Sequence, residues 1–334
     1  MGDYKDNPAK GIIRTEWGKK LVSFIYSTLK YKLLYLGLPG VDLSDITEWL
    51  DYIDQIIAFQ CRDYPNPSSS SQSRSKVVAI ENKLKDLERK GLIKTFSLYD
   101  GYIEEVVLRG RDISGNIFSQ NDVVTIYNLD FCNEITSPLP IVDDKGNTQR
   151  VYKSHAIKKL LEIQRDITAS SRSKKFIMFL TVHASHRDKE MQIFQSQPES
   201  KYLKDYFHKI KRLTQEEKQI RFLKSYILDI IRCNYEHCNF SCYLLPAIYY
   251  KGTGEHRLVT FTIAGALDTS IRTYHIQKPE EFLRTPFLTV EKKRLILYSN
   301  SSIEDLPVNT IDPTDIIKNT KHFAKLWQNQ KMGN

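Results

Sequence analysis

A short apolar run that ends in polar residues is the part of this sequence with the clearest chemical meaning. Residues 123–131 are Val-Val-Thr-Ile-Tyr-Asn-Leu-Asp-Phe, and a second asparagine, Asn133, follows closely. Such a run predicts a buried parallel strand. Open α/β sheets bind ligands at the carboxyl ends of their strands, so Asn128, Asp130 and Phe131 are candidate site residues.

A second segment has the same form. The apolar run 32–36 leads into Gly37-Leu38-Pro39-Gly40 and then into an amphipathic stretch. Glycines at the end of a strand let the backbone approach a bound ligand closely. Together the two segments predict a nucleotide-type site on a Rossmann-like sheet.

The hydrophobic pattern predicts helices that alternate with strands. The predicted helices cover residues 11–30, 42–53, 76–90, 155–167, 199–232 (two helices) and 313–331. The predicted strands cover residues 32–36, 55–60, 92–99, 122–128, 176–182, a hairpin of 242–250 with 258–263, and a strand or hairpin at 285–299. This order predicts an α/β fold, a Rossmann-like mostly parallel sheet with an antiparallel edge hairpin and N- and C-terminal helices.

Three regions are expected along the chain. Residues 1–30 form a leader, disordered to residue 9, and an amphipathic helix; residues 31–270 form the Rossmann-like domain; residues 271–334 form a strand and helix extension. The Ser-rich segment 66–75 is expected to be a flexible loop.

Composition limits the partners and the compartment. The chain has 334 residues, a net charge of +9 and a pI near 9.1, which favours an anionic partner such as nucleic acid, or serves solubility alone. No apolar run has the roughly 18–20 residues that cross a bilayer, and the polar start has no signal-peptide core. We therefore expect a cytoplasmic protein that does not enter membranes. Five scattered cysteines argue against a disulfide scaffold.

The layout of residues 31–265 resembles a class I S-adenosylmethionine-dependent methyltransferase, and is also similar to the bacterial three-Cys-motif partner proteins. The resemblance implies a Rossmann-like fold and S-adenosylmethionine as cofactor. It places Gly37, Pro39 and Gly40 in the cofactor loop. It assigns the ribose hydroxyls to Gln60, or to Glu81 if residues 77–81 form the second strand instead, and the adenine end to Asp100.

The same resemblance gives the polar end of the 123–131 run its role. Asn128, Asp130 and Phe131 would face the transferred methyl group, with the aromatic ring stacked on a flipped base. This implies methyl transfer to nucleic acid, with a protein partner as a further option.

Two other functions remain open. Tyr35 and Leu36 stand where the methyltransferase pattern has an acidic residue, which favours a catalytically degenerate subunit that binds nucleic acid or assembles with a partner. A magnesium-dependent nuclease would instead gather carboxylates from the following set: Asp100, Glu104, Glu105, Asp122 and Asp130.

Two possible metal clusters carry less weight, and no metal is predicted. His183, His186 and Asp188 follow a predicted strand, where the two histidines would point to opposite faces. Cys233, Cys238 and Cys242 lie near His237 but lack the CxxC spacing of a zinc knuckle. The plainer interpretation of these cysteines is that they pack as small apolar groups.

Overall fold

A computed structural model of the chain describes most of its residues in separate stretches. These are residues 7–60, 70–131, 134–142, 146–168, 170, 172–184, 223, 227, 238–252, 257–267, 287–291, 294–299, 302–306 and 312–319.

The strands of these stretches form one large sheet and one small hairpin. Their bounds are β1 Leu33–Gly37, β2 Ile53–Gln60, β3 Thr95–Asp100, β4 Ile126–Asp130, β5 Leu139–Val142, β6 Thr148–Val151, β7 Lys175–His183, β8 Phe240–Leu244, β9 Ile248–Lys251, β10 Arg257–Leu267, β11 Phe287–Glu291, β12 Arg294–Ser299 and β13 Ser302–Leu306. The small hairpin pairs β5 with β6, and the other strands belong to the large sheet.

Helices precede, connect and follow the strands. Their bounds are α1 Pro8–Ile12, η1 Ile13–Lys19 (a π-helical stretch), α2 Lys20–Leu29, α3 Ser44–Glu48, α4 Ser70–Arg89, α5 Ile103–Arg109, α6 Lys153–Asp166 and α11 Pro313–Asn319.

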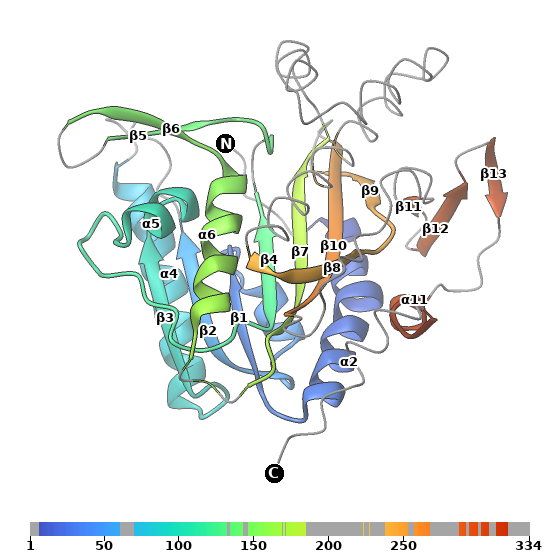
Figure 1. The fold of residues 1–334 in the computed structure, drawn as a ribbon, viewed down its shortest axis with the longest axis horizontal. Coiled ribbons are helices and arrows are strands. Elements are labelled where there is room, and N and C mark those ends of the chain that lie inside the picture. The colour runs from blue at the N-terminus through green and yellow to red at the C-terminus, as the bar shows by residue number, and fades with distance from the viewer. Residues whose placement is uncertain are drawn as a thin grey trace.

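The large sheet has a parallel half and a mixed half (Figure 1). Strands β3, β2, β1, β4 and β7 are neighbours in that order and all run parallel. Strand β10 then pairs antiparallel with β7, and β8 and β9 pair antiparallel with β10. The prediction of a Rossmann-like, mostly parallel sheet with an antiparallel hairpin at one side is confirmed.

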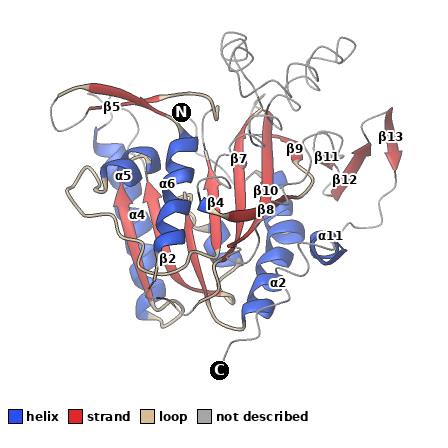
Figure 2. Ribbon diagram, in the orientation of Figure 1, coloured by secondary structure: helices blue, strands red, loops and turns tan. Residues whose placement is uncertain are grey.

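Each face of the sheet is covered by its own set of helices (Figure 2). Side chains of α5 and α6 pack on one face, with Leu36 of β1 and Leu129 of β4 among their partners. The N-terminal helices, α3, α4 and α11 pack on the other face, with Tyr35 and Ile126. Neighbouring residues of β1 and β4 thus belong to opposite cores, as the alternation of side chains along a strand requires.

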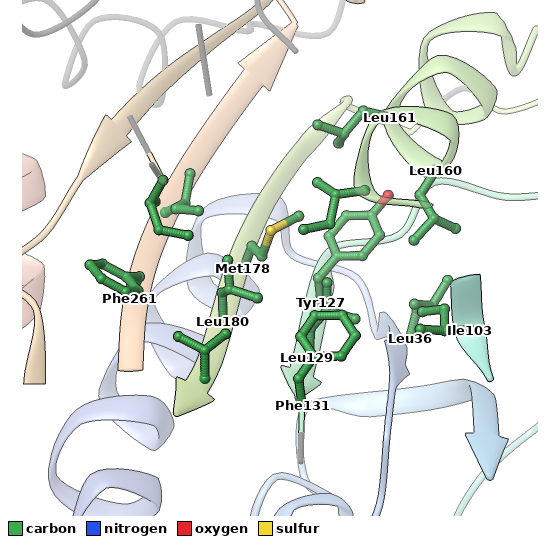
Figure 3. Close-up of a cluster of buried hydrophobic side chains, with 14 of the residues drawn as sticks. Leu36, Ile103, Tyr127, Leu129, Phe131, Leu160, Leu161, Met178, Leu180 and Phe261 are labelled. Atoms are coloured by element: carbon green, nitrogen blue, oxygen red, sulfur yellow. The ribbon is translucent and has the colours of Figure 1, made fainter. Parts of the chain in front are cut away.

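Figure 3 shows the first of these cores, in which Tyr127, Leu129 and Phe131 lie in a row opposite Leu160 and Leu161 of α6.

A buried glutamine fixes α6 to β4. Gln164 is fully buried, and its Nε2 donates to the carbonyl of Val124 at 2.9 Å. Its Oε1 accepts from the Val124 N–H at 2.9 Å and from the Tyr127 hydroxyl at 2.8 Å. One side chain therefore satisfies both the backbone N–H and the carbonyl of Val124, two residues before β4 begins.

The N-terminal helices are tied to strands that lie far away in the sequence. Asn7 accepts from the Ala9 N–H at 2.8 Å, which caps α1, and its amide donates to the carbonyl of Lys251 at 2.9 Å. Trp17 is fully buried in η1, and its indole N–H donates to Thr262 of β10 at 2.9 Å. The expected disordered leader up to residue 9 is wrong from Asn7 onward, because the Asn-Pro pair begins a helix.

Several element boundaries also differ from those expected. Helix α3 ends at Glu48, and Ile53 belongs to β2 rather than to the helix. Helix α4 begins at Ser70, so the predicted loop 66–75 is wrong from there, and residues 66–69 lie outside the described part. The stretch 242–250 holds two strands, β8 and β9, because Pro246 and its neighbours interrupt it. The two helices expected at 199–232 lie outside the described residues, apart from Leu223 and Ile227.

Candidate functional site

The carboxyl end of β1 lies at a topological switch point of the sheet. From β1 the chain moves to β2 and β3 on one side, and it later returns to β4 on the other side. Gly37, the last residue of β1, pairs with Asn128 of β4, and the Leu38 N–H donates to the Asn128 carbonyl at 3.1 Å. Open α/β sheets bind ligands in the crevice outside such a point.

The last residue of β1, Gly37, where the turn begins, must be a glycine. A Cβ atom on Gly37 would lie 2.6 Å from the Asn128 carbonyl oxygen and 2.6 Å from the Tyr35 hydroxyl. Pro39 is buried, while Gly40 is exposed and its carbonyl accepts from the Leu43 N–H at 3.0 Å. The predicted loop is therefore a tight turn with an exposed backbone at the edge of the sheet.

Gln60 and Asp100 stand side by side at the same edge. They end β2 and β3, pair with each other in the register, and the carbonyl of Gln60 accepts from the Gly101 N–H at 3.0 Å. The alternative that residues 77–81 form the second strand is wrong, because they belong to α4, where Glu81 forms an ion pair with Lys85 at 2.6 Å.

A buried aspartate that sequence reasoning missed supports Asp100. The carboxylate of Asp112 accepts from the N–H groups of Asp100, Ser114 and Asn116 at 3.1, 2.9 and 2.8 Å, and from the Asn116 side chain at 2.9 Å. Burial raises the pKa of Asp112, but the four hydrogen bonds outweigh it and leave this pKa below its usual value. The spacing Asp-x-Ser-Gly-Asn is a turn signal that could have revealed this loop.

We expect Asp112→Asn to destabilise the protein in a pH-dependent way. At pH 7 the free energy of unfolding should fall by about 1–3 kcal/mol, since an amide cannot accept all four bonds. A lowered folded pKa stabilises above the unfolded value of about 3.9, so this difference should shrink as the pH falls below about 4. Urea denaturation at pH 7 and at lower pH measures it. The exposed Asp51→Asn is the control, and an equal loss in both variants would contradict the role of Asp112.

One face of the end of β4 carries a chain of polar contacts. The amide of Asn128 donates to the Tyr35 hydroxyl at 3.2 Å and to the carboxylate of Asp45 in α3 at 2.8 Å. Asp45 also accepts from the guanidinium of Arg14 in η1. Burial raises the pKa of Tyr35 well above its usual value, and the nearby Asp45 adds to this. The Tyr35 hydroxyl is therefore neutral and acts as a hydrogen-bond partner.

Asp130 lies on the same face, at the last position of β4. It forms an ion pair with Lys10 of α1, and both side chains are 27% exposed. Burial lowers the pKa of Lys10, but Asp130 and Tyr250 raise it by more, so that Lys10 stays charged. Tyr250 is buried beside this pair, and burial raises its pKa as well. Asp130 is thus a carboxylate with one fixed cation beside it and some access to solvent.

Phe131 lies on the opposite face of the sheet. The Lys153 ammonium lies 5.5 Å from the centre of the Phe131 ring and donates to the Glu134 carbonyl at 2.8 Å. Lys153 also lies 3.8 Å from the carboxylate of Glu104, and both side chains are almost fully buried. Burial raises the pKa of Glu104, while Lys153 lowers it by less. The buried ion pair between Glu104 and Lys153, which the sequence did not predict, therefore joins the first turns of α5 and α6.

The predicted site residues share one edge but do not all converge. Gly37, Gln60, Asp100 and Asp130 are the last residues of four neighbouring strands. Asn128 lies two residues inside β4 rather than after it, and its amide is held by Asp45 and Tyr35. Asn128 and Asp130 face one side of the sheet and Phe131 the other, so the three do not form a single cluster around one group.

The metal and nuclease hypotheses gain no support from the geometry. Asp122 pairs with Arg172 at 3.0 Å ahead of β4, at the opposite edge of the sheet from Asp130. Glu105 pairs with Arg109 at 2.8 Å. Within the described residues, no three His, Cys, Asp or Glu side chains come together as metal ligands. His186, Asp188 and Cys233 lie outside those residues.

The two described cysteines are buried free thiols. Burial raises the pKa of Cys238 to about 11 and that of Cys242 to about 12, so both stay protonated at neutral pH. In the described parts of the chain, no helix has both the length and the apolar character needed to span a bilayer.

The strand order and the switch point define the chain as a Rossmann-like α/β protein. More closely, residues 6–221 match the model of the PP_RS20740-like family, and the chain belongs to this family. No curated protein matches it.

Solved structures that match this chain share little sequence with it. An O-methyltransferase from Bacillus cereus in complex with S-adenosylhomocysteine has a TM-score of 0.33 and 8% identity, over 78% of this chain and 91% of that one. A SAM-dependent methyltransferase from Aquifex aeolicus has a TM-score of 0.32 and 10% identity, over 78% and 99%. An rRNA methylase from Streptococcus thermophilus has a TM-score of 0.31 and 12% identity, over 74% and 95%.

Proposed function

We propose that this chain transfers a methyl group from S-adenosylmethionine to a nucleic acid. The observation that carries the proposal is the row of residues along the carboxyl edge of β3, β2, β1 and β4, centred on the switch point at Gly37. The sequence resemblance to class I methyltransferases, and to three-Cys-motif partner proteins within that likeness, agrees with this row.

The residues present have the chemistry to hold the cofactor. The exposed backbone at Gly40 can approach its methionine part. The Gln60 amide can bond the ribose hydroxyls, and the Asp100 carboxylate can accept from the adenine amino group. The bound cofactor would supply an activated methyl group, and the chain would position the acceptor against it.

The acceptor would lie beside Asp130. A carboxylate at the end of β4 can accept a hydrogen bond from an amino group of a base and so orient its lone pair. Asn128 then acts as a positioning residue, since its amide fixes Asp45 and, through Asp45, Arg14. Phe131, on the other face, supports the edge through its contact with Lys153. The net charge of +9 suits an anionic acceptor.

Calorimetric titration with S-adenosylmethionine and S-adenosylhomocysteine tests the proposal directly. We expect micromolar binding, weakened about three- to tenfold by Gln60→Ala, which removes hydrogen bonds at the carboxyl edge. Gln55→Ala is the matched control, because Gln55 lies toward the other end of the same strand and is also half-buried.

The alternatives predict a different result in this titration and in assays of nucleic-acid binding and cleavage. No heat and no thermal shift at millimolar cofactor would overturn methyl transfer by this chain. Nucleic-acid binding without cofactor binding would then identify a degenerate binding subunit, and a strict magnesium requirement for strand cleavage would identify a nuclease.

A further inference from the structure

Residues of α6, the end of α5 and the β5–β6 hairpin line a hollow. Figure 1 shows these three elements on the same side of the molecule. The volume of the hollow is about 540 Å³, within the 300–1,000 Å³ that ligand pockets usually have, and it is open to solvent. Leu108, Ile141 and Val151 give it an apolar floor. We call it the hairpin groove.

The rim of the hairpin groove is strongly basic. Four cationic side chains line it, Arg109, Arg111, Lys158 and Lys159, together with Glu162, while Glu105 pairs with Arg109 from outside the lining. Both lysines share the Glu162 carboxylate, at 3.9 and 3.8 Å. Exposed ion pairs of this kind contribute little, so a bound anion can replace Glu162 as the partner of the lysines.

The hairpin groove begins close to the carboxyl edge of the sheet. Lys153, the first residue of α6, contacts Phe131 directly after β4, and His155, two residues on, already lines the groove. Lys159 follows Lys153 by six residues, which is about 9 Å along a helix axis. A strand of nucleic acid covers that distance in about three nucleotides, at about 3.4 Å each.

We propose that the hairpin groove binds the phosphate backbone of single-stranded nucleic acid next to the nucleotide held at the carboxyl edge. The idea rests on the proposed function, which it extends by a substrate-binding surface. Phosphates would lie on the cationic rim, and one base would cover the apolar floor. Single strands bind to such a combination of cationic side chains and apolar base contact.

Fluorescence anisotropy with a labelled 12-nucleotide RNA and the DNA of the same sequence tests the proposal on the full chain. Lys158→Glu with Lys159→Glu should weaken binding at least about tenfold at 50 mM salt. The slope of log affinity against log salt should fall by about 1.4, the value for two lost contacts to a single strand. The neutral pair Lys158→Gln with Lys159→Gln should give a smaller loss in the same direction.

Lys85→Glu with Lys90→Glu is the matched control. Lys85 lies on α4 and Lys90 directly follows it; both side chains are 59% exposed and form ion pairs with acidic residues four positions earlier, as Lys158 does with Glu162 four positions later. This pair should change affinity less than twofold. RNA and DNA arms tell which backbone the groove prefers, and a duplex competitor should compete poorly.

The outcomes separate this proposal from the proposed function. Equal loss in the α4 and α6 variants, no binding by the parent chain, or duplex competing as well as single strand would overturn the hairpin groove as a single-strand site. Cofactor titration of the α6 variants should match the parent. If the parent chain binds no cofactor but binds nucleic acid, and the α6 variants weaken that binding, methyl transfer alone would be overturned.

Discussion

Replacing Gln164 with leucine should lower the free energy of unfolding by about 3–5 kcal/mol. Leucine has a similar volume, so the change tests hydrogen bonding rather than packing. It leaves the N–H and carbonyl of Val124 and the Tyr127 hydroxyl buried without their partner. Each unsatisfied buried group costs about 1–3 kcal/mol. Urea denaturation followed by circular dichroism measures the change.

A double-mutant cycle with Tyr127→Phe sharpens this prediction. Tyr127→Phe removes one of the donors to Gln164, so the double variant should cost less than the sum of the single ones. Gln149→Leu, on the exposed strand β6, is the control and should stay within about 0.5 kcal/mol of the parent. A loss of less than 1 kcal/mol for Gln164→Leu would show that water or a shifted side chain satisfies these groups.

On the proposed function, Asp130→Ala should slow methyl transfer at least about 100-fold. The reason is the loss of an acceptor that orients the reacting amino group, since small losses of alignment cost about this factor. Cofactor affinity should stay within about threefold, because Asp130 faces the acceptor rather than the cofactor. Single-turnover transfer of a labelled methyl group, measured beside calorimetry, separates the two effects.

Lys10→Met is the variant that tests this interpretation of Asp130. It breaks the same ion pair but keeps the carboxylate. If Asp130 matters only by holding α1 in place, both variants will slow transfer equally. If Asp130 orients the acceptor, Lys10→Met will retain most of the rate, and Asp130→Asn, which keeps an acceptor oxygen, will lie between the parent and Asp130→Ala.

The sequence predicted the sheet well because its strands are continuous apolar runs with clear ends. It placed Asn128 at the end of its strand, whereas β4 continues to Asp130. The reason is that the end of a central strand depends on its pairing with both neighbouring strands. Asn128 pairs with Gly37 of β1 and with Phe179 of β7, which carries the strand on to Asp130. The edge residues Gly37, Gln60 and Asp100 were predictable, since each closes such a run.

Other parts of the site depend on contacts that no local pattern reveals. Arg14 lies within the predicted helix 11–30 and Lys10 lies just before it, in α1, and no local motif marks either residue. Only the placement of α1 and η1 over β4 and α3 brings them to Asp130 and Asp45. Gln164 did carry a signal, since it follows Leu160 and Leu161 by one helical turn and so lies on their buried face.

The packing of the N-terminal helices has a consequence for how the protein is made. The indole N–H of Trp17 has its hydrogen-bond partner in Thr262, a residue 245 positions later in the chain. At about 5–20 residues per second, a ribosome needs about 12–50 s to cover that interval. During that time the apolar side of η1 has no β10 to pack against. The growing chain therefore exposes this apolar side to chaperones before β10 is made, and η1 reaches its final place only after β10 has been made.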